Sequence, residues 1–113
     1  MPDFERGSVV RVRFPYTDRD TRQRRPAMIV SDGPVGEAGS LLWVVMITSA
    51  ENRAWPDDVP FGDTFAQSGL PAPSVVRPSK IATIEAAQAD PIGKVQPAIL
   101  AEVMSRIGRM LAL

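Results

Sequence analysis

The sequence predicts a small, mostly antiparallel β barrel with one C-terminal helix. Short runs rich in β-branched residues alternate with segments rich in proline and glycine, a pattern typical of small all-β domains. The spacing of apolar residues changes from two to three or four only after Pro97. The chain has 113 residues, of which 44% are hydrophobic. We therefore expect one domain that spans residues 1–113.

The first half of the chain contains three predicted strands. Residues 8–14 (SVVRVRF) alternate between apolar side chains and arginines, as expected of a half-buried strand. Residues 15–25 have turn-forming composition and no period, which predicts an exposed loop. Residues 27–31 (AMIVS) form a short apolar run that suits a buried strand. After a Gly- and Pro-rich turn at 32–39, residues 41–49 (LLWVVMITS) predict the central strand.

The second half begins with loops and returns to strands. Residues 50–61 are polar and acidic, and residues 67–73 (QSGLPAP) are rich in breakers, so both predict loops. Residues 74–77 and 80–85 predict two short strands, because a Pro-Ser dipeptide separates them. Residues 92–95 (IGKV) fit either a last short strand or a turn.

The C-terminal segment predicts an amphipathic helix from about Pro97 to Leu111. Proline is favoured in the first turn of a helix, where its missing N–H costs nothing. Glu102 and Arg106 are spaced four residues apart in the favourable order. The apolar residues that define the buried stripe are Ile99, Leu100, Val103, Met104, Ile107 and Leu111.

The missing residue types exclude several classes of function. There are no cysteines and no histidines, which removes disulfides, thiolate nucleophiles, the usual zinc ligands and every serine–histidine relay. No glycine-rich phosphate loop or other catalytic signature is present. The chain contains no apolar run long enough to span a membrane and no signal peptide pattern. A cytoplasmic protein without a membrane partner is therefore expected.

The net charge is zero, but the charges are segregated along the chain. Residues 1–25 contain seven arginines against four acidic residues, whereas residues 51–63 contain four acidic residues and only Arg53. A neutral protein with this distribution can present a basic face to a polyanion. Two solvated loops of opposite sign explain the same pattern, so both interpretations stay open.

The tryptophans and the paired aspartates have several interpretations. Trp43 lies in an apolar run and is expected in the core. Trp55 lies in a polar loop, where it could stack on a base, contact a partner protein or simply pack. Asp57 and Asp58 are expected in a solvated loop rather than in an acid–base site, because adjacent side chains on a strand point apart.

Three polar stretches could build an anion site. They are RRP at 24–26, TS at 48–49 and VVRPSK at 75–80. If neighbouring strands bring Arg25 and Thr48 together, the guanidinium supplies charge and two donors and the hydroxyl supplies a third donor for a phosphate. The alternative is that Arg25 caps a strand end and Thr48 is an ordinary strand residue.

These motifs, taken in order, resemble the MazF/PemK family of toxin ribonucleases. The stretches that carry the resemblance are RGSVVRVRFPYTD, RRPAMIVS, VVMITS, PSVVRPSKIATIE and PIGKVQPAILAEVMSRIGRML. The resemblance implies a small barrel related to SH3 domains and a homodimer. It also implies an enzyme that cleaves single-stranded mRNA at short motifs without a metal or cofactor, and a cognate acidic antitoxin that occupies the RNA site.

The resemblance assigns roles to individual residues. Arg25 corresponds to the family's catalytic arginine and Thr48 to its catalytic threonine or serine. Arg77 matches an arginine that some relatives use near the scissile phosphate. The full set of expected RNA contacts is Arg22, Arg24, Ser49, Arg77, Ser79 and Lys80, in which Arg22 and Arg24 guide the RNA backbone electrostatically. Some relatives have an aspartate, proposed as the base, where this chain has Ser79. The general base therefore stays open between water and Glu51, which is near Thr48 in the sequence.

Two alternatives to the enzyme remain at this point. One is a non-catalytic toxin of the same fold, similar to the gyrase inhibitor CcdB, since fold does not fix function. The other is a degenerate member that only binds RNA. Met110 and Leu113 lie outside the apolar stripe of the predicted helix, which fits a helix that partly faces a second subunit. The acidic segment 51–63 is expected to gate the RNA site or to contact the antitoxin.

Overall fold

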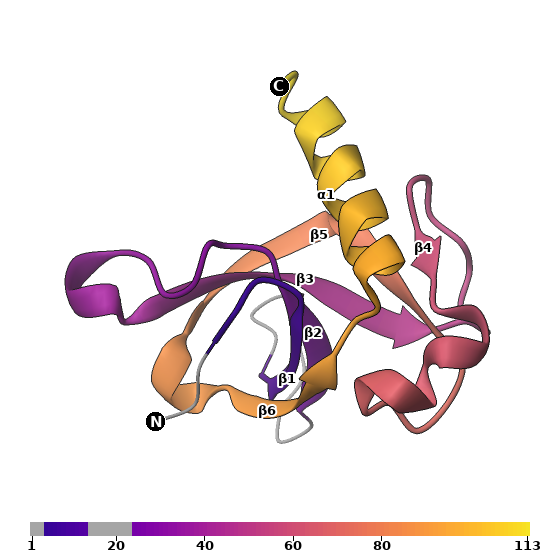
Figure 1. Ribbon diagram of the computed structural model, residues 1–113, viewed down its shortest axis with the longest axis horizontal. Coiled ribbons are helices and arrows are strands. Elements are labelled where there is room, and N and C mark those ends of the chain that lie inside the picture. The colour runs from indigo at the N-terminus through magenta and orange to yellow at the C-terminus, as the bar shows by residue number, and fades with distance from the viewer. Residues whose placement is uncertain (1–3, 14–23) are drawn as a thin grey trace.

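Six strands form one antiparallel sheet in the computed structural model, which describes residues 4–13 and 24–113 (Figure 1). Their spatial order is β4-β5-β3-β2-β1-β6. The strands are β1 (Ser8–Val12), β2 (Arg25–Ile29), β3 (Leu41–Ser49), β4 (Val59–Pro60), β5 (Ser74–Glu85) and β6 (Asp90–Lys94). A single helix, α1 (Pro97–Met110), follows the sheet. The sheet curls into a half-barrel, which confirms the predicted fold class.

Two apolar clusters lie on opposite faces of the sheet, because successive strand residues point to opposite sides. The cluster under α1 contains Val9, Met28, Val45, Ile47 and Val76 together with Ile99, Val103 and Ile107 of the helix. The second cluster contains Val10, Val12, Ala27, Ile29, Leu42, Val44 and Met46. Both clusters pin the register of β2 and β3, since a shift by one residue would exchange their faces.

The prediction for α1 is confirmed, and it explains how the sheet is covered. The helix begins at Pro97 and buries Ile99, Val103 and Ile107 at helical spacing. Glu102 accepts a hydrogen bond of 2.8 Å from Arg106 on the solvent side. Among the described residues, no helix is long and apolar enough to cross a membrane.

The prediction of two strands at 74–77 and 80–85 is wrong, because β5 is continuous through both. Arg77 pairs with Met46, and Ile81 pairs with the adjacent Val45. The three residues Pro78–Lys80 of β5 are thus inserted between two pairs whose β3 members, Val45 and Met46, are consecutive. This irregularity is a bulge. A bulge tolerates proline because the bulged residue does not donate to the ladder.

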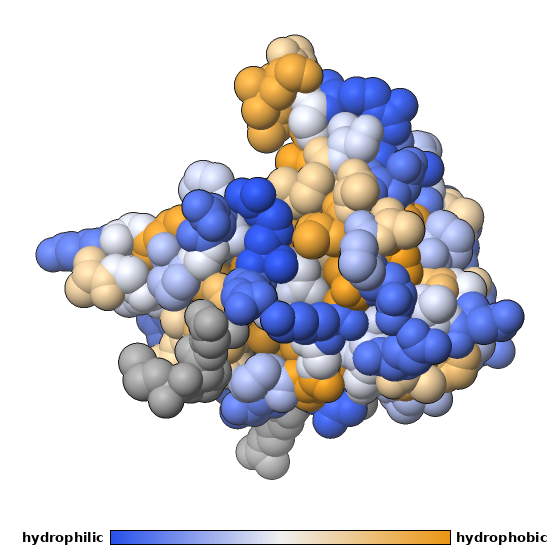
Figure 2. Space-filling view, viewed as in Figure 1, coloured by the Kyte–Doolittle hydropathy of each residue, from blue (hydrophilic) through white to orange (hydrophobic). Residues whose placement is uncertain are grey.

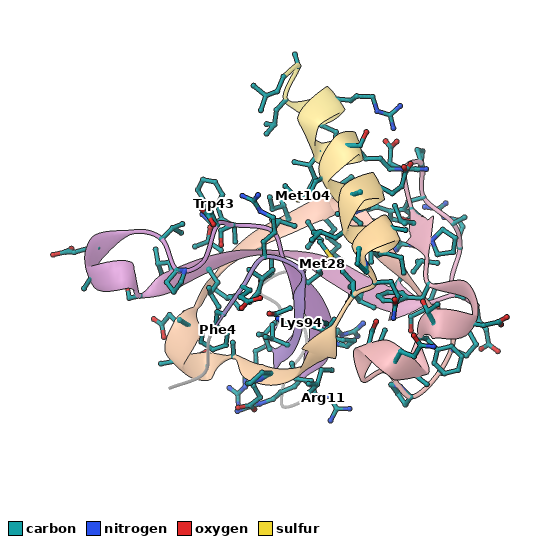
Figure 3. All side chains as sticks on the ribbon, viewed as in Figure 1. Phe4, Arg11, Met28, Trp43, Lys94 and Met104 are labelled. Atoms are coloured by element: carbon teal, nitrogen blue, oxygen red, sulfur yellow. The ribbon has the colours of Figure 1, made fainter. Side chains whose placement is uncertain are left out.

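Trp43 is not a core residue, contrary to the sequence prediction. Its side chain is 50% exposed, whereas its neighbours Leu42 and Val44 are fully buried. Trp43 lies on the same face of β3 as Val45, but α1 does not cover this end of the strand (Figure 3). It instead borders a shallow depression with Ile81 and Thr83 of β5. The apolar run at 41–49 does not indicate which part of the strand α1 covers, so the exposure of Trp43 could not be predicted from it.

The bounds of other strands also differ from the predicted ones: β2 ends at Ile29 rather than at residue 31, and β6 spans Asp90–Lys94 where a strand or a turn was expected at 92–95. β2 begins at Arg25 rather than at residue 27, so Arg25 and Pro26 belong to the strand. The predicted loop at 15–25 lies almost entirely outside the described residues, and so does Arg22.

Candidate functional site

An open cavity of about 680 Å³ lies where β1, β2, β3 and β6 approach the segment that precedes β5. Its polar lining contains Arg11, Arg24, Arg25, Thr48, Ser49, Asn52, Ser74 and Asp90. Its apolar lining contains Pro26, Ile47, Leu70, Pro71, Ala72, Pro73 and Ile92. The cavity therefore combines several hydrogen-bond donors with an apolar wall.

The pairing of β2 with β3 brings Arg25 and Thr48 together. Ala27 pairs with Met46 in the antiparallel ladder. The same register, continued by two residues, sets Arg25 opposite Thr48, and directly opposed residues share one face of a sheet. Both residues line the cavity. The juxtaposition expected from the sequence is thus present.

Thr48 is nearly buried at the end of β3, and its side-chain hydroxyl accepts a hydrogen bond. The residue is 8% exposed. Its Oγ1 accepts a hydrogen bond of 2.7 Å from Nδ2 of Asn52. A turn joins the two residues: the N–H of Asn52 donates to the carbonyl of Ser49 at 3.1 Å, and the N–H of Glu51 donates to the Ser49 hydroxyl at 3.2 Å.

Three guanidinium groups face the cavity, against one carboxylate. Arg25 is half-buried and has no hydrogen-bond or ion-pair partner among the described residues. Arg24 forms an exposed ion pair with Asp90. Arg11 lies on β1 between the other two strands of this region, since it pairs with Pro26 of β2 on one side and with Asp90 of β6 on the other. The site is therefore positive although the chain is neutral.

Two glycines fix the apolar wall of the cavity. The short 3-10 helix Ala66–Ser68 lies directly against β6. A Cβ on Gly69 would lie 2.1 Å from the carbonyl oxygen of Ile92, and a Cβ on Gly93 would lie 2.3 Å from that of Ser68. The two backbones can approach this closely only because neither residue has a side chain. The segment 70–73 that follows is thereby held at the cavity.

Arg77 lies away from this cavity, in a buried ion pair. It is 6% exposed, and its Nε and Nη2 donate to the two carboxylate oxygens of Asp58 at 3.0 Å each. Nη2 also donates to the carbonyl of Arg53 at 2.9 Å. The Trp55 ring covers the guanidinium, with 4.3 Å between the ring centroid and Cζ.

This arrangement corrects one expectation about the acidic segment and shows how Trp55 packs. The expectation of a solvated aspartate pair is wrong for Asp58, whose side chain is 9% exposed. Of the roles left open for Trp55, packing is the one observed. Among the other predicted RNA contacts, Ser79 is exposed and Lys80 lies 5.7 Å from the Trp55 centroid, and neither lines the cavity.

Four parts of the cavity were not expected from the sequence. Arg11 was recognised only as a polar strand residue, and Asp90, Asn52 and the segment 70–73 had no assigned role. A signal existed for Asn52, which follows Thr48 by four residues across a turn-forming Ser-Ala-Glu stretch. Asp90 and the segment 70–73 reach the site through tertiary contacts, which leave no local pattern.

The site is suited to a phosphate with an adjoining apolar group. Guanidinium groups bind phosphate oxygens through charge and paired donors. Within residues 4–13 and 24–113, no group of three or more histidine, cysteine, aspartate or glutamate side chains could hold a metal ion. The donors that the described residues offer are thus arginine, threonine, serine and asparagine side chains.

Comparison with known families shows which family the chain belongs to. The profile of the family described as "PemK-like, MazF-like toxin of type II toxin-antitoxin system" matches residues 5–111. The chain belongs to the PemK/MazF toxin family. Family membership confirms the resemblance drawn from the sequence motifs. No curated protein sequence matches the chain.

Solved structures of MazF toxins share this fold. MazF from Deinococcus radiodurans aligns with a TM-score of 0.74 at 19% identity, covering 100% of each chain. An endoribonuclease from a mycobacterial species, in complex with its cognate antitoxin, aligns at 0.73 and 22% identity over 100% of this chain and 97% of that one. For the Mycobacterium tuberculosis toxin MazF-mt6 the TM-score is 0.67 at 22% identity, over 94% and 97% of the two chains.

Proposed function

We propose that this PemK/MazF family member is a toxin endoribonuclease that cleaves single-stranded mRNA at a short motif without a metal ion. The observation that carries the proposal is Arg25, whose guanidinium faces the cavity beside Thr48 without a partner among the described residues. The family match and the mycobacterial relative that is an endoribonuclease support the same conclusion.

The proposed reaction is attack of a ribose 2′-OH on its own 3′-phosphate. The O2′–P bond forms and the P–O5′ bond breaks, while the 2′-OH loses its proton to a base and the leaving O5′ takes a proton from water. The products carry a 2′,3′-cyclic phosphate and a 5′-OH. Negative charge grows on the phosphoryl oxygens in the transition state, and Arg25 stabilises that charge. Thr48 donates one further hydrogen bond to the phosphoryl group.

The proton of the 2′-OH has two available acceptors. Arg25 is excluded as the base because arginine stays protonated in proteins. Water enters the open cavity, and Glu51 supplies an exposed carboxylate in the turn after Thr48. With neither acceptor held rigidly against the attacking hydroxyl, we expect a slow enzyme, which suffices for a toxin that needs few cuts per message.

The remaining cations at the cavity position the RNA backbone. Arg11 and Arg24 line the cavity together with Arg25, and among the described residues the ion-pair partner of Arg24 is the exposed Asp90. Exposed ion pairs contribute little free energy, so an incoming phosphate replaces Asp90 at small cost. The resulting contacts weaken as salt concentration rises. The apolar wall at 70–73 lies where a neighbouring base would rest.

Two protein partners follow from the family. Structures of MazF toxins include complexes with the MazE antitoxin, so we expect an acidic antitoxin that covers the basic cavity. We also expect a homodimer, as the family resemblance implies, and five large apolar side chains are exposed among the described residues. They are Trp43, Ile81, Met110, Leu111 and Leu113. Apolar side chains gather at the free end of α1 (Figure 2).

The test of this proposal compares two arginine substitutions. Arg25→Ala should lower the rate of RNA cleavage by about 10²–10³-fold, the usual cost of removing one donor to a developing oxyanion. Arg109→Ala, on the exposed side of α1, removes the same charge outside the cavity and should leave the rate unchanged. Cleavage is followed on a long single-stranded RNA in EDTA. Full activity of a folded Arg25→Ala protein would contradict the assignment.

A further inference from the structure

The hydrogen bond between Asn52 and Thr48 determines what the Thr48 hydroxyl can do. A threonine hydroxyl has one hydrogen to donate and two lone pairs that accept. The Asn52 side-chain N–H occupies one lone pair, at 2.7 Å. The hydroxyl hydrogen therefore cannot point at Asn52. No acceptor for that hydrogen lies among the residues that the structure describes, and the hydroxyl borders the cavity.

We propose that Asn52 is a positioning residue for RNA cleavage, which holds the Thr48 hydroxyl as a donor aimed into the cavity. The inference rests on the proposed function, since it is the phosphoryl oxygen of the bound RNA that receives this hydrogen bond. Without Asn52, the hydroxyl rotates freely between donor and acceptor orientations. With Asn52, its orientation is set before the substrate arrives, which lowers the reorganisation that the reaction requires.

The turn after β3 fixes Asn52 in this position. Its backbone N–H is bonded to Ser49, and the N–H of Ala50 donates to the carbonyl of Pro73 at 3.0 Å, which ties the turn to the apolar wall. Asn52 itself is exposed while Thr48 is nearly buried. Water can take the place of the amide in part, so the expected effect is moderate rather than complete.

The effect should appear in kcat more than in KM. The bond from Thr48 strengthens as negative charge grows on the phosphoryl oxygen, so it stabilises the transition state more than the bound RNA. Asn52→Ala should lower kcat about tenfold, the size of one ordinary hydrogen bond. Asn52→Asp keeps the shape but replaces the donor by an acceptor, which draws the Thr48 hydrogen away from the cavity. It should lower kcat further than Asn52→Ala.

The decisive experiment is a double-mutant cycle with Thr48→Val, which removes the hydroxyl and keeps the branched shape. If Asn52 acts through this hydroxyl, Asn52→Ala should cost about tenfold in the wild-type background and less than about twofold in the Thr48→Val background. A purely structural role of Asn52 would cost the same in both. The melting temperatures of all four proteins show whether each one is folded.

Each result of this cycle decides a different question. Equal losses in both backgrounds, or no loss in either, would overturn the positioning role and leave the proposed function intact. Failure of the wild-type protein itself to cleave RNA would overturn the proposed function, and the inference with it. A loss confined to the background that retains the Thr48 hydroxyl supports both.

Discussion

At the scale of single residues, the role of an arginine in this chain depends on which groups surround it. Arg25 faces an open cavity and keeps its donors available among the described residues. Arg77 lies under Trp55 with donors directed at Asp58 and at the backbone. The sequence assigned both arginines to RNA. Because the burial of Arg77 depends on a segment some twenty residues away, no local pattern distinguishes the two.

The buried pair yields a prediction about stability. Asp58→Ala leaves the Arg77 charge buried without its partner, which should lower the free energy of unfolding by about 3–5 kcal/mol. Glu102→Ala removes a carboxylate from the exposed pair with Arg106 and should cost about 0.5 kcal/mol or less. Urea unfolding of the two variants measures both values. Similar, small losses of unfolding free energy in both variants would show that the ion pair between Arg77 and Asp58 does not stabilise the acidic segment.

At the scale of elements, the wall of the cavity depends on one backbone contact. Gly93→Ala places a Cβ against the carbonyl of Ser68, and backbone atoms cannot move aside as a flexible side chain would. We expect a loss of about 1–3 kcal/mol in unfolding free energy, together with weaker RNA cleavage as the segment 70–73 shifts.

Gly108→Ala is the matched control for this prediction. A Cβ at Gly108 meets no atom within 4 Å, and the residue lies inside α1. The same chemical change should therefore raise the unfolding free energy by about 0.5–1 kcal/mol, because alanine favours a helix over glycine. Thermal melts of the two variants should shift in opposite directions. Shifts in the same direction would refute the contact between β6 and the 3-10 helix.

The sequence predicted those elements that have a local cause. β3 and α1 agree closely with expectation, because alternating faces and a helical stripe are local patterns. The break predicted at Pro78 was wrong, since a bulge absorbs the proline where the sheet twists. The prediction that Trp43 lies in the core was wrong, because the exposure of its side chain depends on how far α1 extends over the sheet. In the site, Arg25 and Thr48 were singled out by the resemblance to the family, and their position at neighbouring strand ends agrees with it, whereas Arg11 and Asp90 require the order of the strands.

At the scale of the whole molecule, the fold gathers three arginines at one cavity although the chain is neutral. Arg77 holds Asp58, and Arg106 lies 3.9 Å from Asp57, so the acidic segment is tied to β5 and α1. Arg11, Arg24 and Arg25 line the cavity, where Asp90 is the single carboxylate-bearing residue of the lining among the described residues. A cavity of this charge attracts a polyanion although the net charge is zero. Asp57 and Asp58 are thus paired with Arg106 and Arg77 rather than with the cavity arginines.

The central claim is that this cavity cleaves RNA by attack of a ribose 2′-OH, without a metal ion. The most direct measurement is the chemistry of the ends produced when the purified protein is incubated with a long single-stranded RNA in EDTA. The account predicts cuts at a short recurring motif, with 5′-OH ends and 2′,3′-cyclic phosphate ends. Ends that carry a 5′-phosphate, or cleavage that appears only when magnesium is restored, would contradict it.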